Sequence, residues 1–196
     1  MKYEINFKSI VRKGIKEIHD PWGAYMVTGY QGSAKTSFCV FYTEDKYKDY
    51  KIKTNIKSLS IKDRKIEYFS RLEEILNDYE EHVIYIIDEV SKKYPKHAKC
   101  DVAFYGWLQQ CRKRKRIVFL VLQEFKECPL WLRRPVRYLF TSRRRFGLVF
   151  TSVGDAQECM LDENMEWTCP TIKVYIWKLN KVICSMYDTY EPIEEL

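Results

Sequence analysis

The chain has 196 residues, of which 46% are hydrophobic and 31% charged, with only 7 glycines and 6 prolines. This length and composition predict one folded domain and exclude collagen-like, low-complexity and disordered proteins. No stretch approaches the roughly 18 consecutive apolar residues of a membrane-spanning helix, so no such helix is expected. The net charge of +7 is unevenly spread, because residues 112–145 hold 12 basic and 2 acidic side chains. A concentrated basic segment favours a polyanionic partner.

The hydrophobic pattern predicts helices and strands in alternation. Residues 1–21 are expected to form an N-terminal arm or helix, and residues 22–196 one domain. Strands are predicted at 24–28, 51–55, 66–69, 83–87, 117–122, 136–141 and 148–152, and helices at 35–45, 71–78, 102–115 and 129–134. Residues 172–187 alternate in polarity, and Asn180 and Lys181 suit the turn of a C-terminal antiparallel hairpin. Together these elements predict an α/β fold around a largely parallel sheet.

The seven cysteines show no metal-ligand spacing. No C-x-x-C pair occurs in the sequence, whereas structural zinc sites need such closely spaced pairs. We therefore expect reduced, mostly buried thiols.

A glycine-containing loop follows the first predicted strand. Residues 29–36 read GYQGSAKT and match the phosphate-binding template G-x-x-x-x-G-K-[ST] at every fixed position except Ala34, where the template has glycine. Small residues let successive backbone N–H groups curl round a phosphate, and the N-terminus of the following helix favours the same anion. The predicted nucleotide-binding residues are Gly29, Tyr30, Gln31, Gly32, Ser33, Ala34, Lys35, Thr36 and Ser37. Lys35 is expected to contact the β- and γ-phosphates, and the Thr36 hydroxyl to bind Mg²⁺.

The second half of such a site follows the apolar run at residues 83–87. Asp88 and Glu89 come directly after this run, which is the Walker B arrangement. Asp88 is expected to bind Mg²⁺, and Glu89 to polarise the attacking water. Gln123 follows the next apolar strand and is predicted to orient or sense that water if the two strands are neighbours; the alternative is a glutamine that merely opens a loop.

These motifs resemble the FtsK/HerA superfamily of P-loop motor ATPases. The match covers residues 22–142 and includes the phosphate loop, Asp88-Glu89, the run WLQQCRK at 107–113, Gln123 and Leu132-Arg133. Within the superfamily the chain looks like two viral branches, the genome-packaging ATPases of membrane-containing viruses and the zonula occludens toxin-like assembly ATPases of filamentous phages. Thr54-Asn55 after a short strand is similar to the second branch. The toxin-like ATPases often carry a membrane-spanning helix after the ATPase domain, and residues after 150 show none.

The resemblance implies a RecA/FtsK-like three-layer sandwich and a ring, with a homohexamer expected, that moves DNA with ATP and Mg²⁺. It also implies an arginine supplied to the neighbouring subunit's nucleotide, and Arg112 is the residue at the matching position. Because five basic residues stand together at 112–116, a solvated basic face is the alternative for Arg112. The implied location is the host cytoplasm or the virion, with a capsid or membrane-protein docking partner.

Lysines after Asp88-Glu89 are the predicted DNA contacts. A loop that leaves the nucleotide-bearing strand can respond to hydrolysis, and basic side chains without a base-reading motif predict sequence-tolerant phosphate contacts. The alternatives are a solubilising face and a subunit interface, and the 112–145 segment is the second candidate for DNA. The residues expected to bind DNA are Lys92, Lys93, Lys96 and Lys99.

Four functions fit these features to different degrees. A viral DNA-packaging or translocating ATPase accounts for the most residues, and a motor for virion assembly and extrusion at a membrane is the closest alternative. A small nucleotide kinase fits the chain length, but such kinases rarely follow the second strand with Asp-Glu. A module that binds nucleotide without turnover is the fourth.

Overall fold

An eight-stranded sheet forms the centre of the computed structural model, which describes residues 21–161, 167–179 and 181–188. The strand order is β10-β7-β6-β1-β5-β4-β2-β3, and β6 to β3 in that order are mutually parallel. The predicted N-terminal arm or helix at 1–21 lies outside the described residues except for Pro21. The strands are β1 (Gly23–Thr28), β2 (Lys51–Thr54), β3 (Ile66–Tyr68), β4 (Val83–Ile87), β5 (Ile117–Val121), β6 (Val136–Arg145), β7 (Leu148–Asp155) and β10 (Thr171–Lys178).

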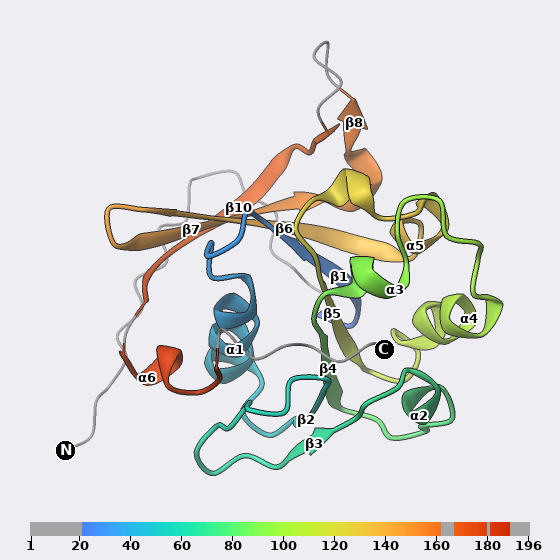
Figure 1. Cartoon of the computed structure of the whole chain (residues 1–196), viewed down its shortest axis with the longest axis horizontal. Helices are drawn as coiled ribbons and strands as arrows, with labels where there is room; N and C mark the ends of the chain where they lie inside the picture. The colour runs from blue at the N-terminus through green and yellow to red at the C-terminus, as the bar shows by residue number, and fades with distance from the viewer. Residues whose placement is uncertain (1–20, 162–166, 180, 189–196) are drawn as a thin grey trace.

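Helices cover both faces of the sheet, so the molecule has three layers (Figure 1). One face packs against α1 (Lys35–Lys46) and the other against α2 (Glu73–Leu76) and α4 (Val102–Gln110). The remaining helical segments are α3 (Val90–Lys93), α5 (Leu130–Arg133), α6 (Lys181–Cys184) and the 3₁₀ turns η1 (Phe125–Glu127) and η2 (Ala156–Glu158). The predicted α/β sandwich around a largely parallel sheet is confirmed.

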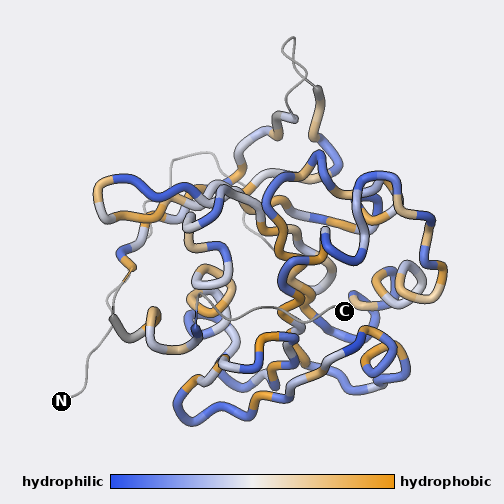
Figure 2. The backbone as a smooth tube through the Cα atoms, viewed as in Figure 1, coloured by the Kyte–Doolittle hydropathy of each residue, from blue (hydrophilic) through white to orange (hydrophobic). Residues whose placement is uncertain are grey.

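The central strands are apolar because both of their faces are covered. All residues of β1, β4 and β5 are buried, and Figure 2 shows hydrophobic residues concentrated along this middle part of the sheet. Side chains alternate along β1, so that Tyr25 and Val27 join the core beneath α1 while Ala24 and Met26 join the core beneath α4. This double burial produces the continuous apolar runs that made these strands predictable.

The antiparallel strands at the C-terminal side are present, but their pairing differs from the prediction. β10 pairs with β7 from Thr171↔Gly154 to Lys178↔Leu148, and β7 pairs in turn with β6. The returning strand expected after Asn180-Lys181 is replaced by helix α6, and Asn180 lies outside the described residues. The physical reason is that β7 already offers β10 a full-length open edge.

Two further differences concern element ends. α4 ends at Gln110 rather than at residue 115, because the five basic residues that follow form a turn leading into β5. β6 continues to Arg145 rather than ending at residue 141, and its last three residues are exposed arginines that carry no hydrophobic signal.

One pair of cysteines contradicts the expectation of free thiols. Cys159 and Cys169 form a disulfide. They flank the short antiparallel pair β8 (Met160–Leu161) and β9 (Trp167–Thr168), whose register places Met160 opposite Thr168. The pairing of β8 with β9 therefore brings together two cysteines whose spacing in the sequence does not predict a disulfide. No helix within the described residues is long and apolar enough to cross a membrane.

Candidate nucleotide-binding site

The loop between β1 and α1 has the backbone of a phosphate cradle. Gly29 has φ +145°, and a Cβ on it would lie 2.4 Å from the Ser142 carbonyl oxygen of β6, so only glycine fits there. Gly32 also has a positive φ, of +74°. The loop leads directly into the first turn of α1, which leaves the free N–H groups of that turn at the same place.

Ala34 occupies the position where the sequence template has glycine. Its φ of 68° and ψ of 36° are left-handed, a conformation that costs an L-residue with a Cβ roughly 1–2 kcal/mol. The loop therefore keeps the glycine-like backbone despite the substitution. The strain lies at the residue immediately before α1.

Lys35 folds back over the loop. Its Nζ donates to the carbonyl oxygens of Gly29 at 2.8 Å and Tyr30 at 3.1 Å. Burial lowers the pKa of Lys35 below its ordinary value, although the carboxylates of Asp88 and Glu89 raise it. The ammonium group thus lies within the loop, close to the two carboxylates.

Thr36 and Asp88 join the loop to the sheet two strands away. The Thr36 hydroxyl donates to Asp88 Oδ2 at 2.8 Å, although β5 lies between β1 and β4. Asp88 is partly buried, and its burial raises its pKa, while hydrogen bonds from Thr36 and from the Glu89 backbone lower it. Asp88 is therefore a partly desolvated carboxylate directed at the first turn of α1.

Asn55 holds Asp88 in place through the main chain. Its Oδ1 accepts from the Asp88 backbone N–H at 2.8 Å, and its Nδ2 donates to the Asp88 carbonyl oxygen at 3.1 Å. The Asn55 side chain is buried at the end of β2, the strand next to β4. Sequence analysis noted the Thr54-Asn55 pair only as part of a resemblance; an amide just after a strand that neighbours the acidic strand was the available signal.

Glu89 lies on the rim of the same site. Its backbone N–H donates to Asp88 Oδ1 at 2.8 Å, and its own φ of 54° is left-handed. The carboxylate forms an ion pair with Lys92 one turn later on α3. A left-handed backbone in a non-glycine residue is uncommon, and such residues cluster at functional sites.

Gln123 follows β5, the strand that lies between β1 and β4. β5 pairs in parallel with both β1 and β4, so the residues after these three strands meet at one edge of the sheet. The Gln123 carbonyl oxygen accepts from the Gly29 backbone N–H at 2.9 Å, which ties the loop to the end of β5. The side chain is exposed and lines a hollow of about 200 Å³ beside Tyr30 and Thr28.

The predicted trans arginine lies at the opposite edge of the sheet. Arg112 belongs to the turn after α4, and this turn leads to Arg116, whose carbonyl oxygen accepts from the N–H of Gly23 at the start of β1. The phosphate loop follows the other end of β1. Arg112 is therefore far from the nucleotide site of its own chain.

Two of the predicted DNA-binding lysines are engaged within the chain. Lys92 pairs with Glu89, and Lys93 Nζ lies 3.4 Å from Glu73 Oε1 on α2. Lys96 and Lys99 follow α3 on an exposed loop. Lys96 and Lys99 are thus exposed, whereas Lys92 and Lys93 have acidic partners within the chain.

The loop and Asp88 fit a nucleotide with a magnesium ion. Two oxygens in neighbouring positions of an octahedral Mg²⁺ shell lie about 2.9 Å apart, close to the 2.8 Å between Thr36 Oγ1 and Asp88 Oδ2. No group of three or more His, Cys, Asp or Glu side chains among the described residues could hold a metal by itself. The donor set thus suits an ion that is completed by phosphate and water.

No protein-family model and no curated protein matches this sequence, but the fold has clear counterparts among solved structures. The N-terminal domain of zonular occludens toxin from Neisseria meningitidis aligns with a TM-score of 0.58 and 18% identity, covering 85% of this chain and 98% of that one. The genome packaging NTPase B204 from Sulfolobus turreted icosahedral virus 2, in complex with ATP-gammaS, gives 0.54 and 10%, covering 83% and 100%. The RadB recombinase gives 0.50 and 10%, covering 82% and 88%. The chain has the fold of these proteins.

Proposed function

We propose that residues 22–196 form an ATPase domain that hydrolyses ATP and moves DNA in a viral setting. The observation that carries this proposal is the hydrogen bond between Thr36 and Asp88, which joins the glycine-containing loop to a partly buried carboxylate across β5. The fold shared with a genome packaging NTPase supports the viral setting. DNA, Mg²⁺ and a homohexameric ring belong to this proposal.

Each side chain then has a defined task. Lys35 leaves the loop carbonyls and contacts the β- and γ-phosphates, while the backbone N–H groups of the loop and of α1 bind the remaining phosphate oxygens. Mg²⁺, when bound by Thr36 and Asp88, neutralises phosphate charge. Glu89 accepts a proton from water as it attacks, and Gln123 orients that water from the neighbouring strand.

Arg112 can serve only a neighbouring subunit, because it lies at the edge opposite its own phosphate loop. A guanidinium supplied in trans stabilises charge on the transferred phosphoryl group. Hydrolysis per subunit should therefore rise steeply with protein concentration as rings form. Mixing Arg112→Ala with Glu89→Gln subunits should restore part of the activity, and strict proportionality to concentration without rescue would contradict both the ring and the trans role.

A second candidate is a motor for filamentous virion assembly and extrusion at a membrane. The observation that favours it is the likeness to the zonular occludens toxin domain, whose TM-score of 0.58 exceeds the 0.54 of the packaging NTPase. Both candidates need DNA handling by the Lys92–Lys99 surface and a docking partner, a capsid component for packaging or a membrane protein for extrusion.

ATPase activity with and without DNA tests the proposal. We expect DNA to stimulate hydrolysis, with binding that weakens as salt rises and depends little on sequence. The variant Lys96→Ala/Lys99→Ala should lose stimulation but keep basal turnover, because neither side chain contacts the nucleotide site. An ATP hydrolysis rate that does not change when DNA is added would count against a DNA motor. Phosphate transfer to a nucleoside would do the same.

A further inference from the structure

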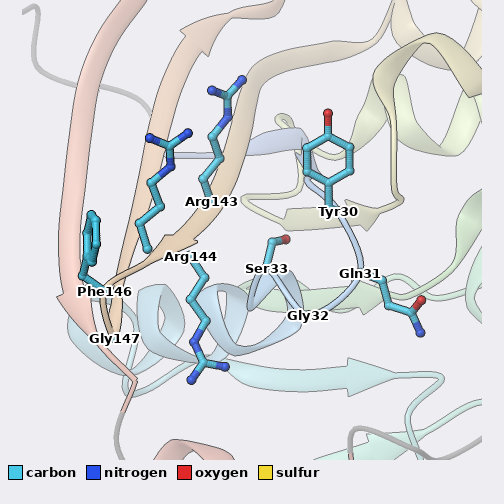
Figure 3. A pocket seen from close by; sticks show the side chains of 9 residues that line it. Tyr30, Gln31, Gly32, Ser33, Arg143, Arg144, Phe146 and Gly147 are labelled. Carbon is cyan, nitrogen blue, oxygen red and sulfur yellow. The ribbon is translucent and has the colours of Figure 1, made fainter.

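A hollow of about 670 Å³ lies beside the phosphate loop, on the flank away from Asp88. Its lining comes from two segments far apart in sequence, residues 30–33 of the loop and residues 143–147 at the tip of the β6–β7 hairpin. Figure 3 shows Tyr30 on one side of this hollow and Phe146 on the other. Anything that fills the hollow touches the phosphate loop and the hairpin tip together.

The hairpin tip holds an aromatic ring in solvent at a conformational cost. Arg145 pairs with Leu148, so Phe146 and Gly147 form a two-residue turn, and both have positive φ, of 52° and 75°. Turns of this kind favour Asn-Gly, because a bulky side chain in the left-handed region is strained. The Phe146 side chain is 98% exposed, so packing does not explain its presence. Strain of this kind is concentrated at functional sites.

Three consecutive arginines precede this ring. Arg143, Arg144 and Arg145 are exposed, and none has an acidic partner within the described part of the chain. Along β6 their side chains alternate, and Figure 3 shows Arg143 and Arg144 directed to opposite sides of the strand. Guanidinium groups therefore border the hollow from both faces of the sheet. In its wall, the buried hydroxyl of Ser33 has no hydrogen-bond partner among the described residues.

We propose that the tip of the β6–β7 hairpin, residues 143–147, is the second wall of the nucleotide site. In this arrangement the arginines contact phosphate oxygens of a nucleoside triphosphate, and the Phe146 ring stacks against its base. The inference rests on the proposed ATPase function, because that function fixes the direction of the nucleotide. Asp88 and Glu89 mark the terminal phosphate on the β4 side of the loop, so the nucleoside end points toward β6 and β7.

A bound nucleotide explains these features better than a DNA strand does. The hollow is built partly from the phosphate loop, so its occupant must lie against the residues that hold the triphosphate. Its contacts, guanidinium to phosphate and ring to base, do not depend on base identity. The wall should therefore discriminate little between one purine nucleotide and another. Binding of DNA at the hairpin tip is the alternative that the test must exclude.

Two variants test the wall against two ligands, ATP and inorganic tripolyphosphate, each with Mg²⁺. Arg143→Ala/Arg144→Ala/Arg145→Ala should bind both ligands about tenfold or more weakly. Phe146→Asn should bind ATP about fivefold to tenfold more weakly and tripolyphosphate within twofold of wild type, since one stacked base is lost. Asparagine also suits the turn, so this variant should melt at a higher temperature than wild type, which separates ligand loss from damage to the hairpin.

A charge-matched control is Lys113→Ala/Arg114→Ala/Lys115→Ala, which removes three cations at the opposite edge of the sheet and should leave both affinities within twofold. The proposal is overturned if the triple arginine variant behaves like this control. It is also overturned if both tip variants keep their nucleotide affinity and lose binding of a 30-nucleotide single-stranded DNA. Wild type that binds ATP no better than Lys35→Ala would instead overturn the proposed function itself.

Discussion

The edge of the sheet where the parallel strands begin and the edge where they end differ in how their charged side chains are paired. Where β2, β4 and β5 begin, acids and bases are paired: Lys53 lies 2.6 Å from Asp78 and 2.9 Å from Glu80, and Lys51 lies 2.8 Å from Glu80. Arg116, which is fully buried, donates to the carbonyl oxygens of Asp78 and Glu80 at 2.6 and 2.7 Å. These five side chains are paired with one another or with backbone carbonyls inside the chain.

Where β1 and β6 end, cations lie without a direct ion pair. Among the described residues Lys35 donates its hydrogen bonds to loop carbonyls, and the arginines of the hairpin tip have no acidic partner. Charges that are paired stabilise a fold, whereas charges without counter-ions are available for a ligand. Loss of a charge should therefore change folding at the first edge and binding at the second.

The largest effect is expected for Lys35→Ala. It removes two charge-assisted contacts to phosphate, worth together about 3 kcal/mol, so ATP affinity should fall roughly 100-fold and turnover should vanish. Titration with a fluorescent ATP analogue measures the affinity. The unfolding midpoint should change little. A lower unfolding midpoint together with unchanged ATP affinity would mean that Lys35 serves the fold and not the ligand.

Glu89→Gln should separate binding from chemistry. The amide keeps the size of the side chain but cannot accept a proton from water, so hydrolysis should fall by about 10² to 10⁴-fold while ATP still binds. Single-turnover hydrolysis measured beside equilibrium binding distinguishes the two effects. Normal turnover would remove Glu89 from the mechanism.

Arg116→Met tests the paired edge. It removes a buried guanidinium from Asp78 and from the faces of Tyr85 and Trp107, and unfolding should become easier by about 3 kcal/mol. Urea denaturation measures this loss. The folded fraction should bind ATP within twofold of wild type; a large loss of affinity would show that the two edges are coupled.

Acid should weaken the paired edge through Asp78. Burial alone raises the pKa of this carboxyl, but hydrogen bonds from Lys53 and Tyr85 outweigh burial and hold the pKa below its ordinary value. A depressed pKa stabilises the fold above the unfolded value near about 3.9, and this contribution disappears as pH falls through the folded value. The stability difference between wild type and Asp78→Asn should therefore shrink below about pH 4, as denaturation at several pH values would show.

The smallest expected effect is at Ala34. Glycine relieves the left-handed strain but increases the freedom of the unfolded chain, so Ala34→Gly should stabilise the protein by about 0.5–1 kcal/mol. Ala103→Gly in the exposed first turn of α4 is the matched control and should destabilise by up to about 1 kcal/mol. Equal effects at both positions would mean that the loop is not strained.

Periodicity and motifs predicted the parts of this molecule that follow local rules. The apolar runs of β4 and β5 and the spacing of Gly29, Lys35 and Thr36 are readable in sequence, because burial on both faces and phosphate binding each demand particular residue types. Features that depend on pairing between distant segments were not readable. Three features depend on the strand order, which the local sequence pattern does not specify. They are the hydrogen bonds between Asn55 and Asp88, the disulfide, and the position of the arginine-rich hairpin tip beside the loop.

The position of β1 in the middle of the sheet has a consequence for the time at which the site is completed. Its neighbour β6 comes late in the chain: Thr28 of β1 donates to the Phe140 carbonyl oxygen, 112 residues further on. Contacts of such long sequence separation form slowly, and a chain emerging from the ribosome cannot form them until both partners have been made. A nascent chain ending before β6 therefore has a phosphate loop with one bare flank.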